Sequence, residues 1–278
     1  MDNFLYFVKQ NKLAALAGVL LVLLMAGVLL PQLWSAYSPI KLDIGARLMA
    51  PGASHWFGTD AFGRDVLSRI LYGGRFTLAI GLGVVALAFV AGVALGTISG
   101  FFGGIVDTII MRCVDAVLSF PALVLAIALA AAFGPSLENA MFAVAITLAP
   151  RFARVARSQA MAISVKPYVE AAISMGVPTP RILTRYILRN GIGPLLVHAS
   201  LSIGSAILQT ASLGFLGLGA QAPVPEWGVD LAANLQYLDS APWVALVPGA
   251  AILLTVLSFN LIGDALVDWL LPKKRNAR

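Results

Sequence analysis

The chain has 278 residues, of which 59% are hydrophobic and only 12% are charged, and its mean hydropathy is +0.89. Because a soluble domain carries about twice that fraction of charged residues, the composition excludes an ordinary soluble protein and predicts an integral membrane protein. The net charge is only +6, and the single cysteine, Cys113, excludes an intrachain disulfide. The two histidines, His55 and His198, form no H-E-x-x-H motif, so we expect no metal site in this chain.

Six apolar runs predict six transmembrane helices and an all-α fold. The first, residues 13–30, follows two lysines and resembles a signal peptide, but it is longer than a secretory apolar region and no clear cleavage site follows it. We therefore interpret it as an uncleaved span. The fourth, residues 139–150, reaches helix length only when it is extended to residue 160, with its arginine side chains reaching toward water. The other four runs are residues 76–106, 116–137, 191–225 and 240–263.

Lysine and arginine are distributed unevenly between the two sides of this arrangement. Residues 151–190 carry seven basic residues against the single acid Glu170, and residues 273–278 are also basic, whereas the segment between spans five and six has three acids and no basic residue. The positive-inside rule therefore predicts that both termini and residues 151–190 are cytoplasmic. The first external segment, residues 31–75, is an exception, because it holds five basic residues: Lys41, Arg47, Arg64, Arg69 and Arg75.

The end of this external segment predicts a short helix at the outer membrane surface, just before the second span. Thr59 or Asp60 is suited to cap a helix that runs toward Leu71, and the apolar residues of that helix would fall on one face. The alternative is an elbow that only sets the angle at which the second span enters the membrane. The residues singled out in this surface helix are Gly58, Thr59, Asp60, Gly63, Arg64 and Asp65.

Residues 166–190 form a polar stretch between two apolar runs and predict a helix, a break and a second helix. Pro167 suits a first helical turn, so a helix is expected over residues 168–175, with Gly176 just past its end. The following Val177-Pro178 is expected to be extended, because a residue before proline is disfavoured in a helix.

The second helix of this stretch is expected from Arg181, with Thr179 as its N-cap and Pro180 at its first position. Arg181, Arg185 and Arg189 recur every four residues, so they would share one face of that helix. We interpret the stretch as a bent, basic helical segment that connects two spans. The alternative is an ordinary cytoplasmic loop that happens to be helical.

Motifs for nucleotide and ester chemistry are absent from the sequence. No lysine follows a glycine, so the G-x-x-x-x-G-K-[ST] phosphate-binding loop does not occur, and neither does G-x-S-x-G. At the start of span three, Arg112 and Asp115 are spaced to neutralise each other beside Asp107, but no charge lies at a predicted bilayer midplane. This distribution argues against an ion-coupled secondary transporter, the main rival from another class, and favours a pathway whose energy comes from outside the membrane.

The motif E-A-A-x-x-x-G in residues 170–176 closely resembles the cytoplasmic loop signature of ABC importer permeases. In that family the pattern continues with I-x-L-P nine residues later, where this chain has Tyr186-Ile187-Leu188-Arg189 and only the leucine matches. The missing proline predicts that the second helix runs straighter or longer than the family pattern.

Further motifs resemble the C-type inner-membrane permeases of the dipeptide, oligopeptide and nickel group of binding-protein-dependent transport systems. They are H-W-F-G-T-D at 55–60, G-R-D-V-L-S-R at 63–69, F-F-G-G at 101–104, S-F-P at 119–121, G-F-L-G-L-G at 214–219, E-W-G at 226–228 and F-N-L-I-G-D at 259–264. The likeness covers nearly the whole chain.

The resemblance implies the permease subunit of an ATP-driven, binding-protein-dependent importer for di- or oligopeptides, with a six-span type I importer fold in the bacterial inner membrane. A nickel or metal-chelate permease of the same group is the nearest alternative. The family works with a second homologous permease, two cytoplasmic ATPase subunits that use ATP and magnesium, and an external solute-binding protein. It implies no catalytic residue, no cofactor and no nucleic-acid partner for this chain.

The family also implies that the loop docks in a groove on an ATPase, with Glu170 and the arginines as polar contacts and two alanines that keep the first helix thin. The coupling residues are then Glu170, Ala171, Ala172, Gly176, Arg181 and Arg185. We divide the chain into an N-terminal span with an external segment (1–75), a permease core of five spans (76–272) that includes the coupling loop (151–190), and a basic cytoplasmic tail (273–278).

Overall fold

The computed structural model describes residues 12–270, with side chains through residue 267, and the basic tail 273–278 lies outside this range. The described chain is almost entirely helical, and it contains no β-strand, only an isolated bridge between Thr59 and Asp65. The main helices are α2 (Lys12–Leu29), α3 (Val66–Phe102), α4 (Gly104–Leu118), α5 (Ala122–Phe133), α6 (Leu137–Ser164), α7 (Pro167–Ser174), α8 (Thr179–Arg181), α9 (Arg189–Phe215), α10 (Trp227–Asn234) and α11 (Trp243–Leu270). Short 3₁₀ segments cover Pro31–Leu33, Ile44–Ala46 and Leu235–Tyr237, and Ile182–Leu188 is a π-helix that joins α8 to α9.

The helix lengths agree with six spans. Four helices of the described chain are long and apolar enough to cross a membrane, namely α2, α3, the helix from Thr179 to Phe215, and α11. The pair α4 and α5, bent by 91°, makes a fifth if the two helices together form one broken span. The sixth is α6, whose 28 residues are long enough although its second half carries arginines, as predicted for the fourth span.

The third span differs from its prediction. The apolar run predicted a helix over residues 116–137, whereas the structure has a bent pair that begins at Gly104 and breaks at residues 119–121. Pro121 precedes α5 and lacks the N–H that a continuous helix would need, which accounts for the break.

The core of the fold is a close contact between α3 and α6. Gly92, Gly96 and Gly100 recur every four residues on α3, and a Cβ added to any of them would lie 2.1–2.5 Å from a carbonyl oxygen of α6. Only glycine allows the two backbones to approach this closely, as in other membrane helix pairs with small residues at every fourth position. This contact fixes α6, and with it the start of the segment that leads to α7.

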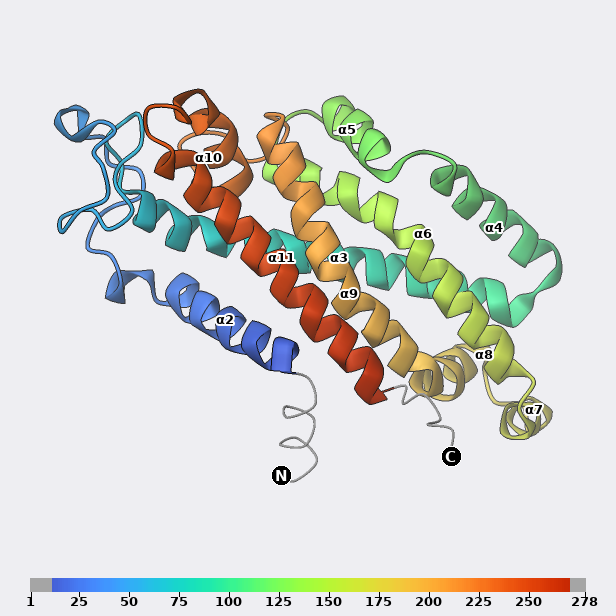
Figure 1. Ribbon diagram of the computed structural model, residues 1–278. Coiled ribbons are helices and arrows are strands. Elements are labelled where there is room, and N and C mark those ends of the chain that lie inside the picture. Colours follow the sequence, from blue (N-terminus) through green and yellow to red (C-terminus); the bar gives the residue numbers. More distant parts are fainter. Residues whose placement is uncertain (1–11, 271–278) are drawn as a thin grey trace, which may run out of the picture.

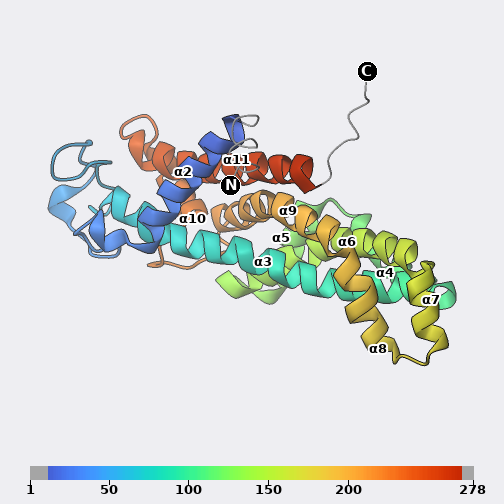
Figure 2. The ribbon, with the colours of Figure 1, turned by 90° about the horizontal axis from the view of Figure 1, so that it is seen from below.

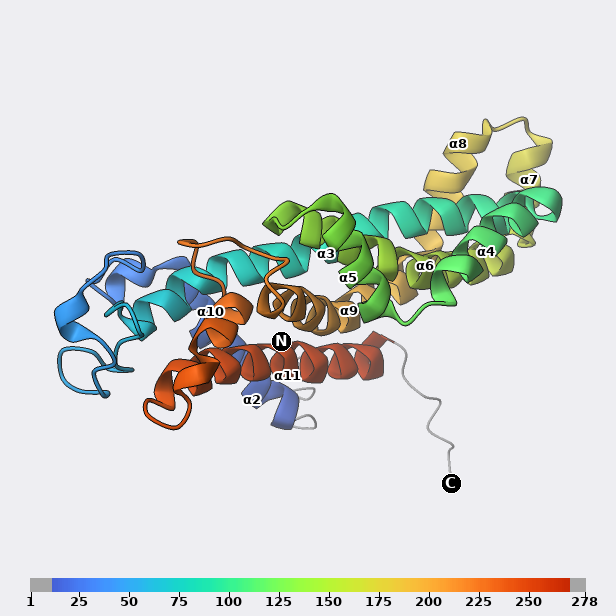
Figure 3. The same cartoon turned by 90° about the horizontal axis from the view of Figure 1, so that it is seen from above.

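The two ends of the molecule have different structures. The irregular segment 31–65 and α10 gather at one end, near the start of α3 (Figure 1). At the other end α7 and α8 project away from the body of the bundle, which is plain when the molecule is seen from below and from above (Figures 2 and 3). The N-terminal helix α2 packs against α11 and crosses it at an angle (Figures 2 and 3). Candidate functional residues occur at both ends.

Candidate functional site

The projecting end contains the predicted helix, break and second helix. The first helix, α7, begins at Pro167, and Gly176 follows it with a φ of +73°. The N–H groups of Gly176 and Val177 donate to carbonyl oxygens of Ile173 and Ala172 at 2.9 and 3.0 Å, which satisfies the end of the helix. Glycine is the residue that adopts this left-handed conformation without strain.

One face of α7 is anchored and the other is exposed. Val169 and Ala172 are fully buried, and Val169 belongs to a hydrophobic cluster with Ile182 and Ile187 of the π-helix. Glu170, Ala171, Ile173 and Met175 face outward, with exposed fractions of 50% for Ile173 and 74% for Met175. Of the two predicted alanines, only Ala172 therefore packs inside this chain, while Ala171 is available to another molecule.

The second helix begins slightly earlier than predicted and continues through the fifth span. Pro178, one residue before the predicted Thr179, is the N-cap, and the helix then continues without interruption from Thr179 to Phe215. The helix passes through Tyr186 and Arg189 without a break, and the prediction that it runs straighter or longer than the family pattern stays a prediction. Arg181, Arg185 and Arg189 are all exposed, and none of them has an ion-pair partner within residues 12–267.

At the opposite end, the separate surface helix predicted from Thr59 or Asp60 to Leu71 is not present. Residues 58–65 form turns, and α3 begins at Val66 and continues unbroken through the second span. The chain leaves the helical region at Gly63, whose φ is +72°, and only glycine fits there because an added Cβ would lie 1.6 Å from the Asp43 carbonyl oxygen. Asp65 is the actual N-cap, and its carboxylate accepts from the Ser68 N–H at 2.7 Å and from the Ser68 hydroxyl at 2.8 Å.

The six predicted residues of this segment nevertheless lie together and are buried. Asp60 accepts from the backbone N–H groups of Phe62 and Arg64 at 2.8 and 2.9 Å and from Nε of Arg64 at 2.6 Å. The Thr59 hydroxyl donates to the Ala46 carbonyl and accepts from the Met49 N–H at 2.8 Å. These contacts close the segment on itself, so its polar groups are used within the chain.

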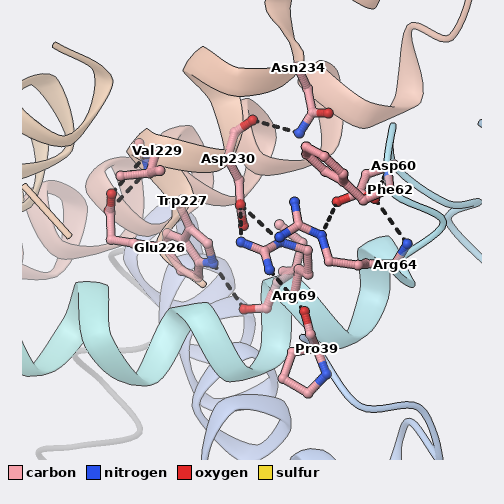
Figure 4. A network of polar contacts seen from close by, with 12 residues as sticks. Pro39, Asp60, Phe62, Arg64, Arg69, Glu226, Trp227, Val229, Asp230 and Asn234 are labelled. Atoms are coloured by element: carbon pink, nitrogen blue, oxygen red, sulfur yellow. Dashed lines mark hydrogen bonds and ion pairs between the residues drawn. The ribbon is translucent and has the colours of Figure 1, made fainter. Parts of the chain in front are cut away.

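A buried ion pair links this segment, α3 and α10 (Figure 4). Arg69 of α3 donates from Nε and Nη2 to one carboxylate oxygen of Asp230, with an Nε distance of 2.9 Å, and from Nη1 to the Pro39 carbonyl at 2.9 Å. Both side chains of the pair are more than nine-tenths buried. Burial raises the pKa of Asp230, and the Arg69 guanidinium opposes that rise.

Glu226 forms a second buried polar contact at the start of α10. Its carboxylate caps the helix by accepting from the N–H groups of Gly228 and Val229 at 3.0 and 2.9 Å, and it also accepts from the Thr77 hydroxyl of α3 at 3.2 Å. Burial raises the pKa of Glu226. The neighbouring Trp227 is completely buried and donates from its indole to the Ile70 carbonyl at 2.9 Å.

Sequence reasoning did not single out Arg69, Glu226 or Asp230 as site residues. The available signal was the excess of basic residues in the external segment, which contradicts the charge rule. In the structure three of these basic residues are bound within the chain: Arg64 binds Asp60, Arg69 binds Asp230, and Arg75 donates to the last carbonyls of α2, at 2.8 Å to Val28 and 2.7 Å to Leu29.

The charges at the start of the third span are also paired differently from the prediction. Asp115 binds Arg154 of α6 at 2.6 Å, and Arg112 is not its partner. Asp107 accepts two hydrogen bonds from Arg157 of α6, at 2.5 and 2.6 Å, and a third from a serine of α3. Helix α4 is therefore held to α6 just above the projecting end.

A protein family covers the part of the chain that contains α6, the projecting end and the helices that follow. The family described as the binding-protein-dependent transport system inner membrane component matches residues 92–276. The chain belongs to this family.

Two relatives extend the likeness to the whole chain. The dipeptide transport system permease protein of Alkalihalophilus pseudofirmus is 44% identical over 268 residues, which cover 96% of this chain and 88% of that protein. The probable D,D-dipeptide transport system permease protein of Escherichia coli is 46% identical over 271 residues, which cover 98% of this chain and 91% of that protein.

The fold of this inner-membrane component is also found in a solved structure of the MetNI methionine ABC transporter in an inward-facing conformation. The likeness has a TM-score of 0.53 at 20% identity and covers 71% of this chain and 94% of that chain. It confirms the predicted fold class, an all-helical type I ABC importer permease. Membership of a binding-protein-dependent family implies a solute-binding protein and ATPase subunits as partners.

Proposed function

We propose that this chain is the transmembrane permease subunit of an ATP-driven importer for di- or oligopeptides. Two relatives that are 44% and 46% identical over nearly the whole chain are named for dipeptide transport, which favours a peptide over nickel or a metal chelate. The chain has no catalytic site and no cofactor of its own in this proposal. ATP and magnesium are used by two separate cytoplasmic subunits, in agreement with the absence of a phosphate-binding loop motif.

The proposed assembly has a second homologous permease beside this one and a solute-binding protein on the external side. Both termini and residues 151–190 are cytoplasmic. The exposed arginines at the projecting end support this orientation, since basic residues that stay in water collect on the cytoplasmic side. The paired and buried arginines of the opposite end place little free positive charge there.

The observation that carries the proposed mechanism is the two-sided burial of α7. Val169 packs against the helix that continues into the membrane and Ala172 is buried beside it, while Ile173 and Met175 leave an exposed apolar face. An ATPase groove that covers this face would grip α7, and closure of the ATPases around ATP would move α6 and α9 with it. Such a movement switches the permease between inward-facing and outward-facing states.

Topology and energy source test the proposal together. In a Cys113→Ser background, single cysteines at Asp43 and Asp239, which are exposed, should react with a membrane-impermeant thiol reagent added outside, and one at Thr179 should not. The reconstituted complex should take up dipeptides only with its ATPases, its binding protein and ATP. Labelling at Thr179 from outside, or uptake by this chain alone driven by an ion gradient, would refute the proposal.

A further inference from the structure

A row of polar side chains follows one face of α9 inside its span. Ser202, Ser205, Gln209 and Ser212 recur at intervals of three or four residues, which places them on one side of the helix. Each serine hydroxyl donates to a carbonyl one turn earlier, at 2.7 to 2.9 Å. Because a hydroxyl that donates still has an oxygen able to accept, this row keeps unused hydrogen-bonding capacity.

Gln209 is the strongest feature of the row. Its Nε2 donates to the Ser205 carbonyl at 3.3 Å, but its Oε1 is buried and has no hydrogen-bond partner within the described residues. A carboxamide oxygen without a partner is unfavourable at membrane depth, where no water replaces the missing bond. The side chain is thus suited to a hydrogen-bond donor that another molecule brings.

An apolar pocket of about 340 Å³ adjoins the outer end of the row. Leu208 and Ser212 of α9 form part of its wall, Leu231 comes from α10, and Ile252 comes from α11. Gly249 of α11 leaves part of this pocket empty, because it has no side chain and the space beside it is open. A Cβ added there would lie 3.8 Å from its nearest neighbour, a Leu231 methyl. The pocket has room for an apolar side chain, and its edge at Ser212 is polar.

We propose that this face of α9 is a binding site for the peptide in transit. Gln209, Ser205 and Ser212 form hydrogen bonds with the peptide backbone, and the pocket holds one apolar side chain. The combination is what selects a peptide, because a lipid chain would fill the pocket but leave the carboxamide without a partner. The inference rests on the proposed function, and it adds the residues that recognise the cargo.

Thiol accessibility tests the location of the row. In the Cys113→Ser background we would place single cysteines at Ser205, Gln209 and Ser212, with Leu23→Cys on α2, 61% exposed, as the control for a span position facing lipid. In the assembled complex turning over ATP, a water-soluble methanethiosulfonate should modify the three α9 positions at least about tenfold faster than Leu23→Cys, and dialanine should slow that reaction. Three α9 cysteines as unreactive as Leu23→Cys, in a complex that transports dialanine, would overturn the site.

Two substitutions test the binding groups separately. Gln209→Leu keeps the size and loses the hydrogen bonds, so the KM for dialanine uptake should rise about three- to tenfold. Gly249→Leu fills the pocket, so uptake of dileucine should fall several-fold while uptake of dialanine is kept. Gly18→Leu in α2, where no atom lies within 4 Å of an added Cβ, is the matched control.

The outcomes separate the two proposals. Equal effects of Gly249→Leu and Gly18→Leu on both dipeptides, together with an unchanged KM for Gln209→Leu, would overturn the binding site and leave the importer function intact. If the parent complex takes up no dipeptide under any condition, the proposed function itself fails.

Discussion

The two ends of the molecule use arginine in opposite ways. At the end that we propose to be external, Arg64 and Arg69 are buried and bound to aspartates, and Arg75 is bound to the last carbonyls of α2. At the projecting end Arg181, Arg185 and Arg189 are exposed and make no ion pair within the described residues. The first group holds segments of this chain together, whereas the second remains available to water or to another subunit.

This difference explains the exception to the charge rule. The rule concerns basic residues that remain charged in water beside the membrane. An arginine that is neutralised by a buried aspartate, or that binds the negative end of a helix dipole, adds little to that charge. Three of the five basic residues in segment 31–75 are of this kind, so the segment opposes an external location less than its composition indicates.

The largest expected effect comes from breaking the external pair. Arg69→Gln leaves Asp230 buried without its partner, so the free energy of unfolding should fall by about 3–5 kcal/mol. The measurement is thermal unfolding of the purified protein in detergent. Arg47→Gln is the matched control, because Arg47 is exposed and reaches only the Tyr237 hydroxyl at 3.4 Å. Equal, small losses in the two variants would mean that the buried pair does not hold the external end together.

A second variant separates structure from function at the same place. Replacing both partners, Arg69→Met with Asp230→Leu, removes the buried charges together and should restore most of the lost stability. If the double variant is stable but fails to respond to the binding protein, the pair also has a functional role at the external end.

The next effect concerns the break after α7. Gly176 has a φ of +73° and open space around it, so a side chain there is strained only through the backbone. Gly176→Val should cost about 1–2 kcal/mol locally and tilt α7, and it should sharply reduce uptake and co-purification of the ATPases while the protein still inserts in the membrane. Gly193→Val is the control, since Gly193 also has open space but lies within α9 and lacks a positive φ. Normal uptake and normal assembly in Gly176→Val would contradict the proposal that the loop couples the ATPases to transport.

A smaller effect depends on pH and Glu226. Because burial raises its pKa, the folded state holds the proton more tightly than the unfolded state, so stability should decrease as the pH rises above about 4.3, the ordinary value for glutamate. Glu226→Gln should flatten part of this dependence and cost roughly 1 kcal/mol for the weakened helix cap. Melting temperatures of both proteins between about pH 5 and 8 check the sign. A parent protein that becomes more stable over this range, with an unchanged slope in Glu226→Gln, would contradict the assignment.

The smallest effect on stability should come from the exposed arginines. Arg185→Gln should change the free energy of unfolding by less than about 0.5 kcal/mol, because no partner in the described chain is lost. It should instead weaken association with the ATPases, most clearly at low salt, where surface charges are least screened. Pull-down of the ATPases at about 0.05 and 0.5 M salt, beside Glu170→Ala, measures this. A clear loss of stability in Arg185→Gln, together with normal association with the ATPases, would mean that Arg185 holds this chain together instead of binding another subunit.

Local signals in the sequence predicted much of this structure. Apolar runs gave most of the spans, and Pro167 and Gly176 predicted the bounds of α7 because both residues act through their own backbone. The features that were missed depend on contacts between distant residues. Helix α4, which was not predicted to begin at Gly104, is held to α6 by a bond between Asp107 and Arg157, fifty positions apart. The external polar cluster, formed by Asp60, Arg64, Asp65, Arg69 and Asp230, requires Asp230 to reach Arg69 across 161 positions. No window of neighbouring residues contains that information.

The length of α3 has a mechanical consequence. Its 37 residues extend about 55 Å, well beyond the roughly 30 Å of the hydrocarbon core. One end is capped by Asp65 in the external polar cluster, and near the other end Phe101 packs against the cluster that anchors α7. If α3 moves as one rigid body, a rotation by about 5° around its centre would carry its two ends roughly 2 Å in opposite directions. A displacement of α7 by the ATPases would then reach the opposite end of the molecule, which we propose to be external, through α3 alone.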